Sequence, residues 1–533
     1  MQKLNFAFVP ICIGIILLLL SWYFSYPVSI DSPYDFAYNH FSYLYWIGVA
    51  ILFASFFIVA VKTENNKLRW TMAIGTFFLI FSQTYFYYMI CGSDAHQLRG
   101  LTEYFISTGD LSFSEPNHYY YQWPIFFILD KITLLVTGLD LRYCEFILYG
   151  TIGSVVTSFI YFYISKVRRN AYIAVTAFFI ILVYVFNFQF FAPFGLSLCL
   201  VLLLFYLDSL SAKLEVTLAT LTIFVVLAFT HMFTPLFFVV YSLVIYVLNR
   251  NKKHLTIFIT TSVMYTLVQV SYPSIYHYVQ ALSNFSFLKY FLWKVTVTTT
   301  GSANTQLFVE SAAQFISRIV VFGTILVTFF GFIVLLKRRK LGRTHYAMLL
   351  TGLIFAATLI IAPSQYSQMS NRSFFLVCIP VSMGASYLCE GKYKKYFEAV
   401  FLLLLVFFTF VLINQSLSDD QIFFQTKAEH QFANFMVDNI NWSTPVSIFS
   451  NYRVQQYLVA KSSGGVVTFG DEGDQIDFPE DLTNYNYVAY TLGLAKRLAA
   501  TNCSVQELFD ANHYNLVYNS GGFSCIFFKR SAK

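Results

Sequence analysis

The sequence predicts a polytopic α-helical membrane protein with a small α/β domain at its C-terminal end. Of its 533 residues, 57% are hydrophobic and only 11% are charged, whereas about 25% of the residues of a soluble domain are charged. Apolar windows of membrane-spanning length recur through residues 1–414. From residue 415 onward the sequence is polar and has no window that could span. We therefore expect a transmembrane domain over 1–414 and an exported soluble domain over 415–533.

The apolar windows predict about thirteen transmembrane helices, because a helix of about 20 mostly apolar residues crosses a bilayer. The windows lie at residues 4–24, 42–61, 70–91, 142–165, 171–188, 192–210, 215–233, 235–249, 255–275, 318–336, 345–362, 373–389 and 396–413. The splits near 192 and 234 depend on linkers of only a few residues. The first window is longer than the apolar region of a typical signal peptide, and no small-residue cleavage site follows it. We expect it to be a retained span.

The distribution of Lys and Arg predicts which helix ends face the cytoplasm. If the N-terminus lies inside, every inside loop is basic, and the densest group is Lys337–Arg343. Loops rich in Lys and Arg stay on the cytoplasmic side. An odd number of spans then places the C-terminal domain outside. The basic residues form no stripe interleaved with exposed aromatic residues, so the net charge of +7 gives no reason to expect a nucleic-acid partner.

One polar stretch, residues 92–141, interrupts the apolar part of the chain and is predicted to lie outside. Its titratable side chains include Asp94, His96, Arg99, Glu103, Asp110, Glu115 and His118. Burying such groups without partners is costly, so they should face water or a site at the membrane surface. We expect a helix over 95–107. The segment 123–137, which contains Asp130 and Lys131, is too short to span and predicts a surface-lying or re-entrant helix.

The region 415–533 alternates short β-rich runs with segments of helical spacing. The β-rich runs are PVSIFS, NYVAY, NLVYN and FSCIFFK, and the helical segments are KAEHQFANFMVDNI and GLAKRLAA followed by CSVQELFDAN. This pattern predicts a small α/β domain. Cys503 and Cys525 both fall in it and are candidates for a disulfide if the domain is exported. For Cys91 and Cys144, free buried thiols are favoured over a disulfide.

Three segments carry a resemblance to a known family. The outer loop has the early Asp94, then HQLRGLTEYFISTGD, and then HYYYQWPIFFILDKITLLVTGLD, while THMFTP (230–235) and NRSFFLVCIP (371–380) are weaker matches. Together with the string of spans and the C-terminal domain, this order resembles the GT-C superfamily of membrane glycosyltransferases. One departure matters. Protein mannosyltransferases share an adjacent Asp-Glu pair in this loop, but here Ala95 follows Asp94, which argues against protein mannosylation.

The resemblance implies an enzyme that moves a sugar from a polyprenyl-phosphate-linked donor to a glycan, lipid or protein acceptor on the outer face, usually with inversion. Such chemistry needs a cation or metal ion to meet the leaving phosphate. It also needs a carboxylate to take the proton of the acceptor. A site at the membrane boundary allows both while the lipid tail stays in the bilayer. Apart from a divalent metal ion in some such enzymes, we expect no cofactor.

Asp94 is the candidate general base, or a ligand of the metal ion if the enzyme uses one, because it lies just beyond the third window. The alternative is that Ser93 or Asp94 only caps the helix that follows. His96, Arg99 and Glu103 come next on the same helix and are candidates for substrate binding. For Arg99 and Glu103 the alternative is an ordinary exposed pair at i,i+4 spacing.

His231 and Arg372 are further candidates for substrate binding, at predicted outer ends of spans. His231 lies in LAFTHMFTP, next to Thr230 and Thr234, and could instead be a satisfied polar residue of a helix end. Arg372 opens a late span in SNRSFF. It can clamp a carrier phosphate through its forked guanidinium group, or it can anchor the helix at the lipid headgroups.

Two other functions stay open from the sequence. The first is a flippase or transporter for lipids or polysaccharides, which would often show internal repeats and ionisable residues near the middle of the membrane. The clustering of polar residues at span ends and in one outer loop favours surface chemistry instead. The second is a non-catalytic membrane scaffold with an exported domain, since fold alone does not fix function.

Overall fold

The structure is a computed structural model of the chain, and it has two compact units. The described residues are 2–27, 40–62, 65–86, 93–112, 120–167, 170–186, 192–210, 213–270, 272, 312–338, 340–361, 367–390, 395–400, 403–404, 427–440, 446–450, 454–455, 457–458, 467–471, 486–490, 514–519 and 525–529. The helical unit groups Met1–Ile11, Ile51–Ile80 and Tyr149–Leu412. The mixed unit groups Cys12–Ala50, Phe81–Leu148 and Ile413–Lys533.

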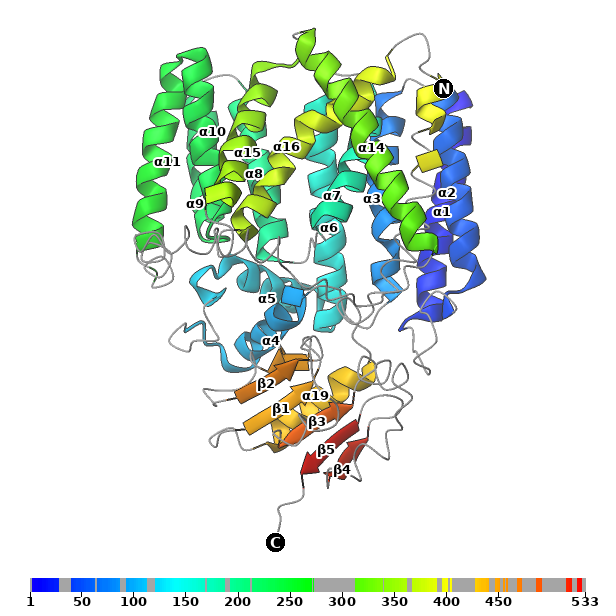
Figure 1. Cartoon of the computed structure of the whole chain (residues 1–533), viewed down its shortest axis with the longest axis vertical. Coiled ribbons are helices and arrows are strands. Elements are labelled where there is room, and N and C mark those ends of the chain that lie inside the picture. The colour runs from blue at the N-terminus through cyan, green and yellow to red at the C-terminus, as the bar shows by residue number, and fades with distance from the viewer. Residues whose placement is uncertain are drawn as a thin grey trace, which may run out of the picture. The chain divides into compact units, whose positions relative to one another are not determined.

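Twelve of the predicted windows coincide with helices in the described part of the chain (Figure 1). They are α1 (Gln2–Ser25), α2 (Tyr43–Lys62), α3 (Asn66–Phe81), α6 (Leu141–Ser165), α7 (Ala171–Phe186), α8 (Pro193–Asp208), α9 (Leu214–Ala228), α10 (Thr234–Asn249), α11 (Lys252–Val270), α14 (Ala312–Lys337), α15 (Arg343–Ile361) and α16 (Ser367–Leu388). A 3₁₀ turn, η2 (Ser82–Phe86), follows α3. The splits near 192 and 234 are confirmed. Most of the window 396–413 lies outside the described residues.

Length and composition give a narrower test of membrane crossing. By that test, two helical segments of the described chain, Phe8–Ser25 and Leu141–Ser165, are long and apolar enough to span, and several other apolar helices are shorter. Thirteen spans therefore stay a prediction.

Local signals in the sequence explain where several helices begin and end. Pro193 opens α8, and Pro235 lies in the first turn of α10, where a backbone N–H would lack an intrahelical acceptor in any case. Gly138 ends a helix of the mixed unit, α5 (Ile125–Thr137), at φ 64°, and its N–H donates to the carbonyl of Leu134 at 2.8 Å. Glycine adopts this left-handed conformation without a steric penalty.

Within the helical unit, α16 packs against α7, α14 and α15, while α10 packs against α11 and α15 (Figure 1). Helix ends that carry basic residues meet one another there. The contacts are Lys166 Nζ to Ser209 Oγ at 2.9 Å, Lys253 Nζ to Asp208 Oδ1 at 3.6 Å and Arg343 Nη1 to Asn249 Oδ1 at 3.2 Å. All of these ends are predicted to lie inside, so the packing agrees with the expected alternation of helix direction. Which side faces the cytoplasm stays a prediction.

The mixed unit contains α4 (Ser93–Thr108), α5, α19 (Lys427–Asn439) and a five-stranded sheet. The strands are β1 (Val446–Ser450), β2 (Val467–Asp471), β3 (Tyr487–Tyr490), β4 (Tyr514–Asn519) and β5 (Cys525–Lys529). Their order is β2-β1-β3-β5-β4, with β1 parallel to β2 and β3, and with β5 antiparallel to β3 and β4. All four predicted strands are present, and β2 is an addition. The predicted helix after residue 493 lies outside the described residues.

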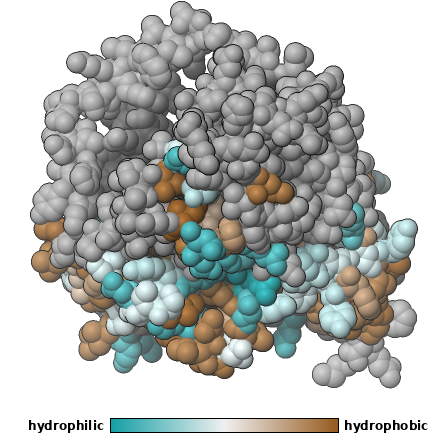
Figure 2. All heavy atoms as spheres, turned by 90° about the horizontal axis from the view of Figure 1, so that it is seen from below, coloured by the Kyte–Doolittle hydropathy of each residue, from teal (hydrophilic) through white to brown (hydrophobic). Residues whose placement is uncertain are grey.

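The helix α5 separates a buried face from an apolar exposed one. Phe126, Phe127 and Asp130 are buried, whereas Leu135 and Val136 are 69% and 80% exposed. Its 13 residues reach about 20 Å, at 1.5 Å per residue, which is less than the roughly 30 Å hydrocarbon core. These features fit a helix lying in the membrane interface. Figure 2 shows hydrophobic and hydrophilic residues interspersed over the described part of the face that is seen from below.

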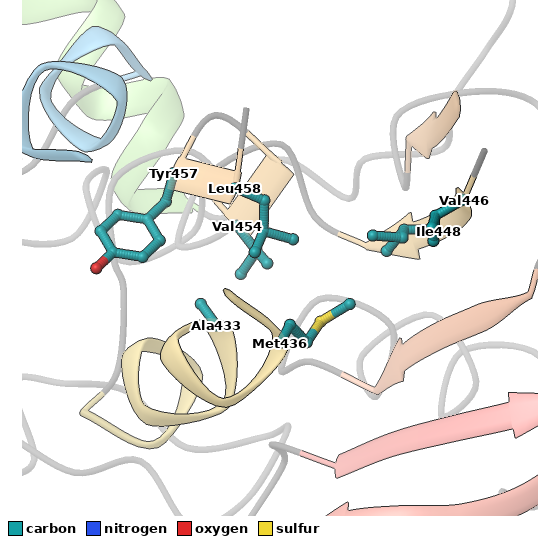
Figure 3. Packing of buried hydrophobic residues seen from close by; sticks show 7 residues of the cluster. All are labelled: Ala433, Met436, Val446, Ile448, Val454, Tyr457 and Leu458. Atoms are coloured by element: carbon teal, nitrogen blue, oxygen red, sulfur yellow. The ribbon is translucent and has the colours of Figure 1, made fainter. Parts of the chain in front are cut away.

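A small apolar core holds the C-terminal sheet and α19 together. Figure 3 shows its members, Ala433, Met436, Val446, Ile448, Val454, Tyr457 and Leu458. The side chain of Tyr457 is completely buried, and its hydroxyl points away from the labelled apolar residues (Figure 3). A buried tyrosine usually finds a polar partner for its hydroxyl.

Candidate functional site

Arg99 is the centre of a buried ionic group in the mixed unit. Its Nε donates to Glu103 Oε1 at 2.9 Å, and its Nη1 donates to Glu145 Oε2 at 3.1 Å. The side chains of Arg99 and Glu145 are only 4% and 3% exposed, and that of Glu103 is 21% exposed. The i,i+4 pair of Arg99 and Glu103 is therefore present, but it is not the exposed pair that the sequence left open. A buried cation needs such carboxylate partners, because it has lost its water.

A third carboxyl group adds to the acidity of this region. Asp130 on α5 is completely buried, and burial raises its pKa to about 7. The positive charge of Arg99 lowers this pKa only in part, and the nearby Thr102 hydroxyl donates its proton to the carbonyl of Leu98 at 2.9 Å. A side chain with such a pKa can take up or release a proton near neutral pH.

The other candidates on α4 are Asp94 and His96, and their proposed roles are not tested by the structure. Asp94 lies in the first turn of α4, and its side chain is outside the described residues. Its role as general base, metal ligand or cap therefore stays a prediction. His96 is completely buried, and its substrate-binding role also stays a prediction. Glu115 and His118 lie outside the described residues.

Sequence reasoning missed Glu145 and Asp130, although each left a signal. Glu145 is the only acidic residue in the apolar window 142–165, and an ionisable residue in such a window marks a functional site by default. Asp130 lies four residues after Phe126, so it shares the buried face of α5. In both cases the sequence signal was an acidic residue within an otherwise apolar segment.

In the helical unit, the structure brings His231 and Arg372 into direct contact. Nη1 of Arg372 lies 2.7 Å from Nε2 of His231. The guanidinium carbon of Arg372 also lies 5.3 Å from the ring centroid of Phe194, a cation–π distance. These residues come from the start of α8, the linker between α9 and α10, and the first turns of α16. The contact joins the two helix-end candidates that the sequence selected separately.

Hydrogen bonds hold the imidazole of His231 at both ring nitrogens. Nε2 faces Arg372, which can only donate, and the backbone N–H groups of Phe233 and Thr234 donate to Nδ1, each at 3.2 Å. Nδ1 lies 2.8 Å from the Thr234 hydroxyl, which lies 2.9 Å from the Ser197 hydroxyl. Ser197 in turn donates to the carbonyl of Phe194 at 2.8 Å. These contacts fix the orientation of the imidazole ring against the guanidinium group of Arg372.

The two groups of residues offer different chemistry. The Arg372 group places a cation where several apolar helices end, which suits the phosphate of a lipid carrier. The Arg99 group neutralises a buried cation with carboxylates and leaves additional acidity at Asp130. Asp94 belongs to the mixed unit and Arg372 to the helical unit. That they share one layer at the membrane boundary stays a prediction.

The described side chains that could hold a metal ion are dispersed. In the parts of the chain that the structure describes, no three His, Cys, Asp or Glu side chains converge as metal ligands. The side chain of Asp94, the predicted ligand, lies outside the described residues. Cys144 is a buried free thiol, as favoured from the sequence, whereas the pair Cys503–Cys525 falls outside the described residues.

Comparisons with known proteins add a limited likeness. No protein-family model matches the sequence, and no curated protein sequence matches it. Among solved structures, the chain is similar to ArnT from Cupriavidus metallidurans in the apo state, with a TM-score of 0.47 and 9% identity over 86% of this chain and 97% of that chain. The same protein bound to undecaprenyl phosphate gives a TM-score of 0.44 and 10% identity over the same shares of the two chains. At these TM-scores the likeness assigns neither a family nor an activity to this chain.

Proposed function

We propose that the chain is an integral membrane glycosyltransferase that moves a sugar from a polyprenyl-phosphate-linked donor to an acceptor at the outer face of the membrane, with inversion. The observation that carries the proposal is the contact of Arg372 with His231 and Phe194 at converging helix ends. A guanidinium group held in this way can bind a phosphate whose lipid tail remains in the bilayer.

In the proposed reaction, Arg372 and Asp94 have different roles. The bond between the anomeric carbon of the sugar and the phosphate oxygen breaks, and the leaving phosphate keeps the electron pair. Arg372 stabilises the charge that develops there. The acceptor atom forms the new bond to the anomeric carbon from the opposite side. Its proton goes to the carboxylate of Asp94.

Several features support the remaining parts of the proposal. The windows of membrane-spanning length and the basic loops support an integral membrane protein with its N-terminus inside. The buried Arg99 group gives α4, which begins at Ser93, a fixed attachment to α6 through Glu145. The first turn of α4, with Asp94, is thereby held near a constant position, as a general base requires.

The test is transfer from a defined polyprenyl-phosphate-sugar by the purified protein, with wild type compared with Asp94→Asn. Removing a positioned base typically lowers the rate about 10²- to 10⁴-fold, while binding of the donor should change little. Asp110→Asn is the matched control, because Asp110 is exposed on the loop after α4. Wild-type turnover by Asp94→Asn would remove Asp94 from the mechanism, and no transfer by wild type from any such donor would contradict the proposed function.

A further inference from the structure

Tyr457 connects the core of the C-terminal region to the ionic group on α4. Its ring is part of the apolar cluster with Ala433, Met436 and Leu458, and packs against the ring of His430 at a centroid distance of 5.1 Å. Its hydroxyl leaves this core and donates to Glu103 Oε2 at 2.6 Å. Both residues belong to the mixed unit.

Glu103 is bound from both sides in this arrangement. Its Oε1 accepts from Nε of Arg99 at 2.9 Å, while its Oε2 accepts from Tyr457. Arg99 also donates from Nη1 to Oε2 of Glu145 on α6 at 3.1 Å. A hydrogen bond from a hydroxyl to an ionised carboxylate is short and roughly twice as strong as one between neutral groups. The C-terminal region therefore holds α4 at the same carboxylate that pairs with its buried cation.

A polar chain on the other side orients the Tyr457 hydroxyl. The side-chain amide of Asn434 lies 2.6 Å from the hydroxyl oxygen and 3.1 Å from Nε2 of His430. The atom of Asn434 that faces the hydroxyl is Oδ1, and the atom that faces the imidazole is Nδ2. The hydroxyl of Tyr457 therefore lies between two acceptor oxygens, Oδ1 of Asn434 and Oε2 of Glu103, with one proton to donate. These two contacts fix the position of the hydroxyl against Glu103.

We propose that Tyr457 is a positioning residue that fixes Glu103, and through it α4, from within the C-terminal region. The inference rests on the proposed function in one respect, because α4 carries Asp94 in its first turn. Tyr457 itself touches no reacting atom. It keeps the helix that presents the proposed base in one place, so the C-terminal region takes part in catalysis by holding α4.

The activity of the variant Tyr457→Phe tests the role of the contact with Glu103, because this change keeps the ring and removes only the hydroxyl. We expect kcat to fall about tenfold, the size typical for losing a hydrogen bond to a charged group. We also expect the acidic limb of the kcat profile to move to higher pH, because the lost bond favoured the ionised carboxylate. In a Glu103→Gln background, Tyr457→Phe should lower kcat much less than in wild type, because both changes break the same contact.

Tyr487→Phe is the matched control, since Tyr487 lies on β3 and packs against the same apolar cluster. It should keep the kcat and the pH profile of wild type. The inference is overturned if Tyr457→Phe also behaves like wild type, or if its effect on kcat is undiminished in the Glu103→Gln background.

A measurement that needs no turnover separates this inference from the proposed function. Hydrogen exchange of the backbone amides of α4, followed by mass spectrometry on the full-length protein, should be faster in Tyr457→Phe than in wild type and Tyr487→Phe. This measurement shows whether the contact between Tyr457 and Glu103 holds α4 in place, even if the wild-type protein transfers no sugar. Equal exchange of α4 in all three proteins would overturn the role of Tyr457 as a positioning residue.

Discussion

At the scale of single residues, two arginine side chains each contact defined polar neighbours. His231 contacts Arg372 through Nε2, and its Nδ1 accepts from the backbone N–H groups of Phe233 and Thr234. Arg99 is held by Glu103 and Glu145. Apolar residues of similar volume would often stabilise a fold as well as a buried ion pair does. A buried ion pair is therefore better explained by the orientation that it gives to its side chains than by stability. Two predictions follow from particular side chains.

The first concerns the guanidinium group of Arg372. Arg372→Ala should weaken binding of a polyprenyl phosphate about 10- to 100-fold, because a charge-assisted contact with the phosphate is lost. Arg372→Lys should restore only part of it, since an ammonium group cannot form the two-pronged contact. Equilibrium binding to the purified protein in detergent measures the effect. Arg343→Ala is the control at the opposite helix ends, and equal affinity in Arg372→Ala and wild type would exclude the phosphate contact.

The second concerns the pH dependence of stability through Asp130. Burial raises the pKa of Asp130 to about 7, whereas it is about 4 in an unfolded chain. Between these values the folded state holds a proton that the unfolded state has lost, so the contribution of Asp130 to the free energy of unfolding falls as pH rises from about 4 to 7. Asp130→Asn should remove this contribution, which is of the order of 4 kcal/mol.

Thermal unfolding of wild type and Asp130→Asn across this pH range measures the difference. Asp110→Asn, which changes an exposed carboxyl group, should keep the wild-type slope. Parallel pH profiles for wild type and Asp130→Asn would show that Asp130 is not the group that titrates.

At the scale of the elements, α14 and α16 approach so closely that only glycine fits at their crossing. A Cβ atom on Gly384 would collide with the carbonyl oxygen of Thr328 and the backbone nitrogen of Phe332, both on α14. Gly331 likewise faces the backbone of Gly384. Small residues allow this approach, and dispersion and close backbone contacts then hold helices together within a membrane.

Gly384→Ala should therefore lower stability by about 1–3 kcal/mol, the usual range for overpacking a close contact. Gly323→Ala on α14 is a matched control, because a Cβ there meets nothing within 4 Å. That control should be neutral or stabilising by about 0.5–1 kcal/mol, since alanine favours a helix interior. The apparent melting temperature in detergent compares them. If Gly384→Ala melts at or above the temperature of Gly323→Ala, the close crossing does not exist.

At the scale of the whole molecule, two compact units are each built from separate stretches of sequence. The helices α1, α2 and α6 each contribute residues to both units. Their orientation in a membrane follows from the basic loops alone, so it needs a direct test.

Single cysteines at exposed positions supply that test in intact cells. Lys340→Cys should resist a membrane-impermeant thiol reagent, because its loop is predicted to lie inside, whereas Asp110→Cys should react. Both positions are exposed, unlike the neighbouring Leu341. Labelling of the wild-type protein, which has only the native cysteines, gives the background signal. Reaction at position 340 and protection at position 110 would reverse the proposed orientation.

The sequence by itself determined the elements of this protein. Apolar windows gave the helices, the short polar interruption at 92–141 gave α4 and α5, and the β-rich runs gave four strands. These features depend on periodicity and composition over neighbouring residues, which a sequence displays directly. It also selected Arg99, His231 and Arg372, because polar groups beside apolar segments are conspicuous. The strand β2 was missed, since GVVTFG is short and lies between glycines.

Only the tertiary structure decided which of these residues meet. Arg99 and Glu145 are 46 residues apart, His231 and Arg372 are 141 apart, and Glu103 and Tyr457 are 354 apart. Spacing along a helix predicts contacts three or four residues away, as for Arg99 and Glu103. Contacts across such distances depend on how whole helices pack, and that packing buried the Arg99 group and brought the hydroxyl of Tyr457 to Glu103.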